Sequence, residues 1–188
     1  MQINRLRAEA YQSGHDRMAH LHDSGIEILD RIQSFSPSIW GKGKPSNHDA
    51  WTVLADVYRD AVTLYCLISL QSLVLLLQGS ALAEPRSNLV EVLQKKLQKA
   101  LALPATRRLV LWPLIVLGVE AGSGNSAQRS FVQGRLHEMA RFTGTHAPVA
   151  ASKTFVTAWT SSKTEWDSYF TKSSIFAMQM AVDMSQVR

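Results

Sequence analysis

The side chains of this chain that could perform chemistry are a few histidines and carboxylates, and metal binding is the first chemistry to consider. His137 and Glu138 begin the His-Glu-x-x-His pattern of zinc proteases, but Arg141 stands where the second histidine ligand belongs. His15 and His22 would lie two turns apart on a helix, which is too far for both imidazoles to bind one ion tightly. We therefore predict no metal-binding residue in this chain.

Glu120 is the best ionisable candidate for an active site, because it ends an otherwise apolar stretch. Burying an unpaired carboxylate is costly, so we expect Glu120 to form an ion pair with Arg129 and to have a structural role. The segment from Gly122 to Gly124 lacks the Gly-Lys-Ser/Thr ending of a phosphate-binding loop, and no Gly-x-Ser-x-Gly or Ser-x-x-Lys pattern occurs. The sequence predicts no catalytic residue and no cofactor, and thus a protein that is not an enzyme.

The stretch from Leu109 to Ala121 must position Glu120, and its apolar residues leave no polar face. Such a helix is surrounded by other elements rather than exposed to solvent. Pro113 suits the first turn of a helix, so the helix is predicted to begin near Leu111 or Trp112. Trp112 is either a wall of a ligand pocket or an aromatic anchor of the core, and we favour the anchor.

A second helix is predicted from Asn47 or Asp49, either of which could cap it, to about Gln78. Its segment 61–77 carries no charge, but it is just short of the ~20 apolar residues that span a bilayer and contains four polar residues. We expect a core helix or one face of a dimer interface, and no membrane span. Before it, Pro, Gly and Ser residues predict a loop over 35–47.

The net charge of +5 comes from the segment between Arg86 and Arg108. There Leu89, Val90, Leu93 and Leu97 recur at helical spacing, so a basic face is predicted on the opposite side, formed by Lys95, Lys96 and Lys99. A solvated face is the favoured interpretation, and binding of phosphate or of an acidic partner is the alternative.

Composition and periodicity together predict an all-α fold, a single-domain irregular bundle of about six to eight helices. Hydrophobic residues make up 46% of the 188 residues and charged residues 19%, which is typical of a folded chain. The single cysteine, Cys66, excludes an internal disulfide and is expected to be a small buried side chain. We expect an N-terminal helical segment and loop over 1–46, a helical domain over 47–170, and a tail or last helix over 171–188.

The order of motifs resembles the regulatory domain of fungal zinc-cluster transcription factors, the fungal-specific transcription factor domain of the second type. A Leu-Trp-Pro-Leu helix ending in Gly-x-Glu-Ala is followed by an Arg-x-x-Val segment, an Arg-Leu-x-x-Met-Ala helix with a glycine after it, and then tryptophans. The helix around Tyr58 and Tyr65 looks like the preceding element of the family. The matching positions are Leu111, Trp112, Pro113, Leu114, Gly118, Glu120, Ala121, Arg129, Val132, Arg135, Leu136, Met139, Ala140, Gly144, Trp159 and Trp166.

The resemblance implies a transcription regulator-like protein in the nucleus, or in the cytoplasm if the domain stands alone. The family's zinc-cluster module needs six thiolates and this chain has one, so we expect no direct DNA binding. We expect it to act through a protein partner or homodimer formed by the 49–78 helix, or by sensing a hydrophobic, sterol- or lipid-like molecule. A stand-alone accessory protein or small enzyme of a biosynthetic pathway is the alternative. Residues expected to be pocket or core anchors are Tyr58, Tyr65, Trp112, Glu120, Trp159 and Trp166.

Overall fold

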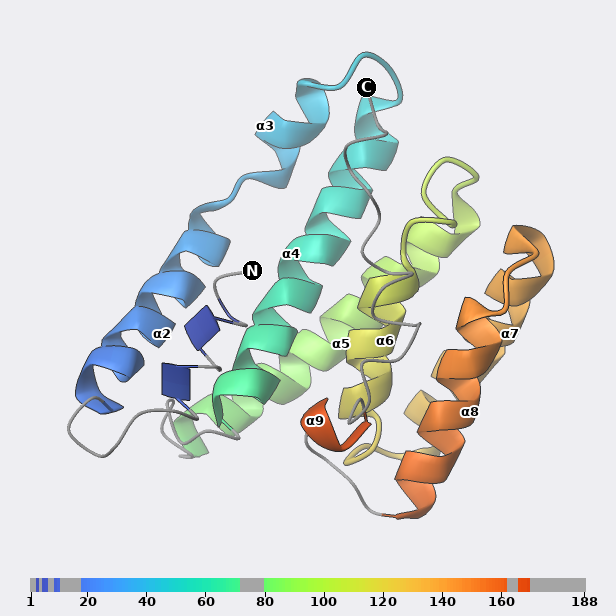
Figure 1. Cartoon of the computed structure of the whole chain (residues 1–188). Helices are drawn as coiled ribbons and strands as arrows, with labels where there is room; N and C mark the ends of the chain where they lie inside the picture. The colour runs from blue at the N-terminus through green and yellow to red at the C-terminus, as the bar shows by residue number, and fades with distance from the viewer. Residues whose placement is uncertain are drawn as a thin grey trace. The chain divides into compact units, whose positions relative to one another are not determined.

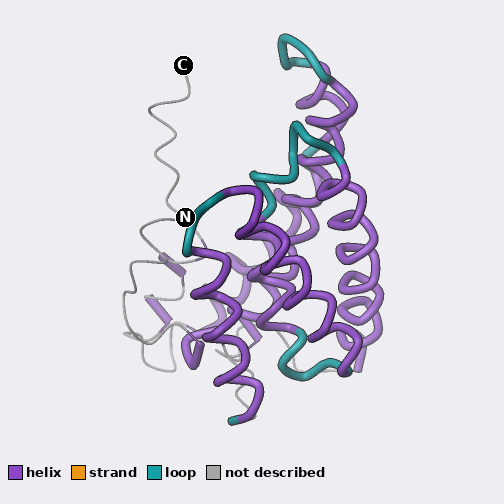
Figure 2. Tube along the Cα trace, turned by 90° about the vertical axis from the view of Figure 1, so that its right-hand side faces the viewer, coloured by secondary structure: helices purple, strands orange, loops and turns teal. Residues whose placement is uncertain are grey.

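The computed structural model describes residues 3, 5, 6, 9, 10, 18–71, 80–161 and 166–169, and in this part of the chain the regular elements are helices (Figure 1). No strand occurs among the described residues, and loops join the helices (Figure 2). The predicted all-α fold is therefore confirmed. The helices are α2 (Met18–Ser34), α3 (Pro37–Lys42), α4 (His48–Gln71), α5 (Ser80–Ala102), α6 (Leu111–Glu120), α7 (Ser126–Thr143), α8 (Ala147–Thr160) and α9 (Trp166–Tyr169).

The chain forms two compact units, which we call the N-terminal unit (Met1–Leu117) and the C-terminal unit (Gly118–Arg188). The boundary falls inside α6. Residues 171–188, for which a tail or last helix was predicted, lie outside the described residues.

Helix α4 is the centre of the N-terminal unit, and α2, α3 and α5 pack against it (Figure 1). Val57, Ala61 and Leu64 recur at helical spacing and are fully buried, so they form an apolar stripe along α4. Leu67 and Leu70, on other sides of the helix, are buried too. Leu93 and Leu97 of α5 are also fully buried. The second half of α4 therefore belongs to the core.

The predicted loop over 35–47 is wrong for its first half, which contains α3. Pro37 occupies the first turn of α3, and the Ser36 hydroxyl caps the helix by accepting a hydrogen bond from Ile39 N at 3.4 Å. A Ser-Pro pair is therefore a helix start here as well as a turn signal. Gly41 is buried against α4, where His48 Nδ1 lies 3.1 Å from its carbonyl oxygen.

The C-terminal unit contains the helical hairpin α7–α8, whose ends agree with the sequence. Asn125 caps α7 by accepting a hydrogen bond from Gln128 N at 2.9 Å. Gly144 ends α7 with a φ of 68°, the left-handed conformation that glycine adopts without strain. Pro148 lies in the first turn of α8.

Candidate functional site

The C-terminal turn of α6 is bonded by side chains from three other helices of the C-terminal unit. Trp159 Nε1 of α8 donates a hydrogen bond to the carbonyl oxygen of Gly118 at 3.0 Å. The Tyr169 hydroxyl of α9 donates to the carbonyl oxygen of Val119 at 3.4 Å. Because the last carbonyls of a helix have no partner within it, the bond from Trp159 satisfies the carbonyl of Gly118. The carbonyl of Val119 also accepts a hydrogen bond from Gly122 N at 3.0 Å.

Arg129 of α7 completes this arrangement. Its Nε donates to the carbonyl oxygen of Ala121 at 2.9 Å, and one terminal nitrogen donates to that of Gly122 at 2.7 Å. A guanidinium at the C-terminal end of a helix also interacts favourably with the helix dipole. Gly118, Arg129 and Trp159 of the sequence motif therefore lie together where the C-terminal end of α6 meets α7 and α8. We call this contact region the joint.

Glu120 is the last residue of α6 and is half-buried, between residues whose carbonyls bond to Arg129 and Tyr169. Burial raises the pKa of the Tyr169 hydroxyl to about 12; nearby Arg129 lowers that pKa and nearby Glu120 raises it. Both charges thus act on the same hydroxyl. The Glu120–Arg129 ion pair stays a prediction. The sequence did not suggest the hydrogen bonds from the Arg129 guanidinium to the carbonyls of Ala121 and Gly122.

Aromatic side chains of α8 and α9 form a cluster next to this joint. Phe155 is fully buried and stacks on Trp159, with ring centroids 5.5 Å apart and planes 8° apart. Tyr169 meets the Phe155 ring edge-on at 5.8 Å, and the Arg129 guanidinium lies 5.9 Å from the Trp159 ring centroid. Gly118 leaves room for Phe155, because a Cβ at this position would overlap the ring. Trp159 is buried within this cluster, and Trp166 is half-buried at the start of α9.

Trp112 belongs to a separate cluster in the N-terminal unit. Its ring stacks with Tyr58 at 5.9 Å and meets Tyr65 edge-on at 5.9 Å. The Tyr58 hydroxyl donates to the carbonyl oxygen of Leu109 at 2.7 Å, and burial raises its pKa. Tyr58, Tyr65 and Trp112 therefore come together in the structure, and their role as pocket or core anchors stays a prediction.

The basic face predicted on 95–99 needs a correction at Lys96. Its ammonium lies 2.7 Å from Asp60 Oδ2 and 3.5 Å from Asp56 Oδ1, both on α4, whereas Lys95 and Lys99 are exposed. Arg59 lies 3.0 Å from Asp56 and 3.5 Å from Asp60. Asp60 is buried, and a buried carboxylate needs such partners. Lys96 is therefore part of an α4–α5 ion network, and Asp56 and Asp60, four residues apart, were the sequence signal for it.

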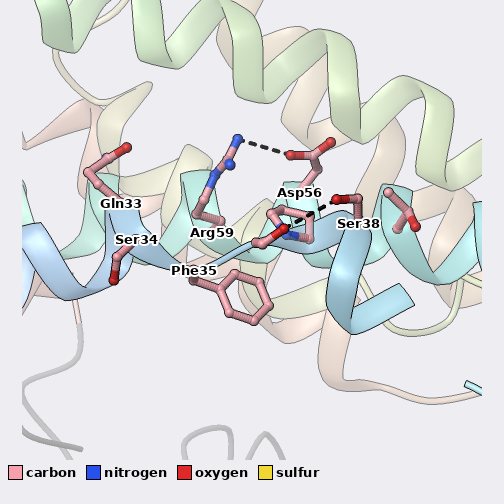
Figure 3. Close-up of a pocket in the computed structure, with 9 residues that line it drawn as sticks. Gln33, Ser34, Phe35, Ser38, Asp56 and Arg59 are labelled. Carbon is pink, nitrogen blue, oxygen red and sulfur yellow. Dashed lines mark hydrogen bonds and ion pairs between the residues drawn. The ribbon is translucent and has the colours of Figure 1, made fainter. Parts of the chain in front are cut away.

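An open hollow of about 430 Å³ lies where α2, α3 and α4 meet. Figure 3 shows Arg59 and Asp56 bonded to each other on one side of it, with the α2–α3 connection below. The hollow is lined mainly by polar side chains, among them Gln33, Ser34, Ser38 and Thr52.

Exposed apolar side chains gather on α3 and just before it, which the predicted loop did not suggest. Ile39 is 74% exposed, Phe35 39% and Trp40 36%. Trp40 meets Trp51 of α4 edge-on at 6.0 Å, and the Lys44 ammonium lies 4.0 Å from the Trp40 ring centroid. We call Phe35, Ile39, Trp40, Lys42 and Lys44 the α3 surface.

The described part of α4 shows the opposite distribution. Its large apolar side chains up to Leu70 are buried or half-buried, so this part lacks the exposed apolar face that dimerisation through the 49–78 helix would need.

Cys66 is buried, as expected, and burial raises the pKa of its thiol to about 12. Among the described helices, none combines the length and apolar character needed to cross a membrane. The described histidines, cysteine and acids form no group of three that could bind a metal ion.

Comparison with known proteins agrees with the motifs. The family described as the fungal specific transcription factor domain matches residues 1–164. The chain is 39% identical over 185 residues to the phomenoic acid biosynthesis cluster-specific transcriptional regulator of Leptosphaeria maculans.

That alignment covers 98% of this chain and 36% of the regulator, so the chain spans just over a third of the length of this relative. No solved structure matches the chain. The family match begins at residue 1 and so also includes the part of the chain before Tyr58, the first residue named in the motif resemblance. Both matches support a role in the regulation of transcription, and the chain belongs to the family of the fungal specific transcription factor domain.

Proposed function

We propose that this chain is a regulatory helical module of a transcription regulator, which works in the nucleus through contacts with other proteins and reads no DNA itself. The observation that carries the proposal is the match to the fungal specific transcription factor domain over 1–164, together with the 39% identity to a transcriptional regulator. A single cysteine cannot supply the thiolates of a zinc cluster, which is consistent with a module that does not read DNA.

The geometry supports a structural use of three polar or charged side chains in the described helices. Arg129 bonds two carbonyls, Trp159 anchors a helix end, and Asp60 is enclosed by Lys96 and Arg59. An active site requires ionisable groups that converge on an accessible cleft. These groups instead join helices to one another, which favours a binding module over the alternative of a small enzyme.

Protein contacts are the favoured mode of action, and the α3 surface is a better candidate for them than α4. Ile39 and Trp40 are exposed, whereas the described apolar side chains of α4 are committed to the core. Large exposed apolar side chains are typical of interaction sites. The hollow beside α3 is a poor site for a sterol-like molecule, because it is open and mainly polar. A rise in melting temperature with a sterol panel would indicate a sterol site elsewhere in the chain.

The name of the relative suggests which genes are regulated. That protein is a regulator specific to a biosynthesis gene cluster. We propose that this chain acts likewise on genes of a biosynthetic pathway, as part of their regulation and not as an enzyme of the pathway.

The test is to alter the gene in its own host and to measure the transcripts of the neighbouring genes. Disruption should lower or raise these transcripts together. Trp159→Ala, which removes the bond to Gly118 and the stack on Phe155, should act like the disruption. Thr157→Ala, an exposed position on the same helix, is the matched control and should leave transcripts unchanged. Unchanged transcripts after disruption would refute the proposal.

A further inference from the structure

The α3 surface combines exposed apolar side chains with positive charge. Ile39 is the most exposed large hydrophobic side chain in the described part of the chain, and Trp40 follows it directly. Lys42 is exposed, and the Lys44 ammonium lies over the Trp40 ring at 4.0 Å. From Phe35 to His48 the chain carries these two lysines and no acid, and the nearest acid that follows is the exposed Asp49 in the first turn of α4. A partner that covers Ile39, Trp40, Lys42 and Lys44 is therefore expected to bring apolar side chains and negative charge together.

The surface is also held in place. Gly41 is buried where α3 approaches α4, and the ring of His48 bonds to its carbonyl oxygen. Trp40 packs edge-on against Trp51, whose ring centroid is 5.9 Å from the Lys44 ammonium. A surface with a fixed backbone loses little conformational entropy when a partner binds. Trp is also the side chain most enriched among the residues that dominate binding energy.

We propose that the α3 surface is a docking site for an acidic amphipathic peptide segment of another protein. Its apolar side chains cover Ile39 and the exposed edge of Trp40, and its carboxylates pair with Lys42 and Lys44. Binding of an amphipathic helix through its apolar face is a common mode of peptide recognition. This proposal rests on the proposed function only in assuming that the chain works through protein contacts.

The experiment measures the dissociation constant of a fluorescent amphipathic peptide of Glu, Leu and Phe by anisotropy, with the 188-residue chain. Ile39→Ser and Lys42→Glu should each weaken binding, Ile39→Ser by about 10-fold or more. Val156→Ser, at a 45% exposed residue of α8, and Lys95→Glu, at an exposed residue of α5, are the matched controls. Both controls should bind like the unaltered chain.

Three further probes distinguish specific binding at the docking site from nonspecific binding. A peptide with Ser in place of Leu and Phe, and one with Lys in place of Glu, should both fail to bind. Vesicles of phosphatidylserine and phosphatidylcholine should bind no better to the unaltered chain than to Ile39→Ser. Equal binding of the acidic peptide to Ile39→Ser, Lys42→Glu and the unaltered chain would overturn the proposal, as would binding of vesicles in place of the peptide.

The two proposals can fail separately. Unchanged transcripts after gene disruption would refute the proposed function and leave the peptide measurement as it stands. Should Ile39→Ser lower the melting temperature, Lys42→Glu carries the test alone, since its side chain is exposed. If disruption alters the transcripts but neither Ile39→Ser nor Lys42→Glu changes peptide binding, the docking site alone would be refuted.

Discussion

Two helical glycines of the C-terminal unit should respond to alanine with opposite signs. Gly118 lies in α6 against the Phe155 ring, and Gly134 lies in α7 with nothing within 4 Å of a Cβ built on it. In a helix, alanine is more favourable than glycine by about 0.5–1 kcal/mol. Helix propensity alone therefore predicts that both substitutions stabilise the protein.

Packing reverses the sign at Gly118. The new Cβ would overlap Cε2 and Cζ of Phe155 and lie 3.0 Å from Cδ2, and this ring is fully buried and stacked on Trp159. Forcing an extra methyl group into a packed core costs about 1–3 kcal/mol. Because two atoms of a fully buried, stacked ring overlap the new methyl group, the upper part of this range applies, about 2–3 kcal/mol. After subtraction of the propensity gain, Gly118→Ala should lower the free energy of unfolding by about 1–2.5 kcal/mol. Gly134→Ala should raise it by about 0.5–1 kcal/mol.

Urea unfolding followed by circular dichroism measures both changes, and thermal unfolding should show shifts of about 2–4 °C per kcal/mol for a chain of this size. Phe155→Leu provides the decisive second step, because a smaller side chain makes room for the methyl group. Gly118→Ala should cost less in the Phe155→Leu background than in the unaltered chain. A stabilising Gly118→Ala, or an equal cost in both backgrounds, would refute the packing account of the joint.

Three further changes test other parts of the structure. Arg129→Met keeps the side-chain stem but loses both carbonyl bonds, so the free energy of unfolding should fall by about 1.5–3 kcal/mol in urea titrations, and a loss below that range would show that the cap is weak. Asp60→Asn should cost about 3 kcal/mol, and Lys96→Met should cost less in that background than alone; additive losses would contradict the ion network. Because burial raises the pKa of Cys66 from 9.0 to about 12 and that of Tyr169 from 10.0 to about 12, the unfolded chain loses these protons first. The melting temperature should therefore fall between pH 9 and 12, with a smaller fall in Cys66→Ala.

Local signals in the sequence were sufficient for the helices that carry them. The start of α6 near Leu111 was predicted, because it depends on the conformation of one residue, Pro113. Helix α3 was missed since its Ser, Pro and Gly residues are equally typical of a loop. What decides in its favour is the close packing of Gly41 on α4, which composition does not reveal.

The contacts of charged residues were harder to predict. Lys96 was assigned to a solvated face because its neighbours Lys95 and Lys99 are there, but Asp60 on α4 lies 2.7 Å from its ammonium. Arg129 was assigned to Glu120 by charge, and its guanidinium also bonds two main-chain carbonyls next to it. Carbonyl groups are present at every residue, so a sequence carries no mark of the ones that need a partner. Such bonds can be identified only from a structure that places the end of α6 next to α7.

The measurement that tests the central claim most directly is transcription from a reporter gene to which this chain is tethered. The chain is fused to an unrelated DNA-binding module in fungal cells. The amount of reporter transcript is compared with that from the module alone, at equal amounts of the two proteins in the nucleus. The account predicts a several-fold change in transcript that is lost in Trp159→Ala and kept in Thr157→Ala. Equal transcript from the fusion and from the module alone would contradict the claim that this domain regulates transcription.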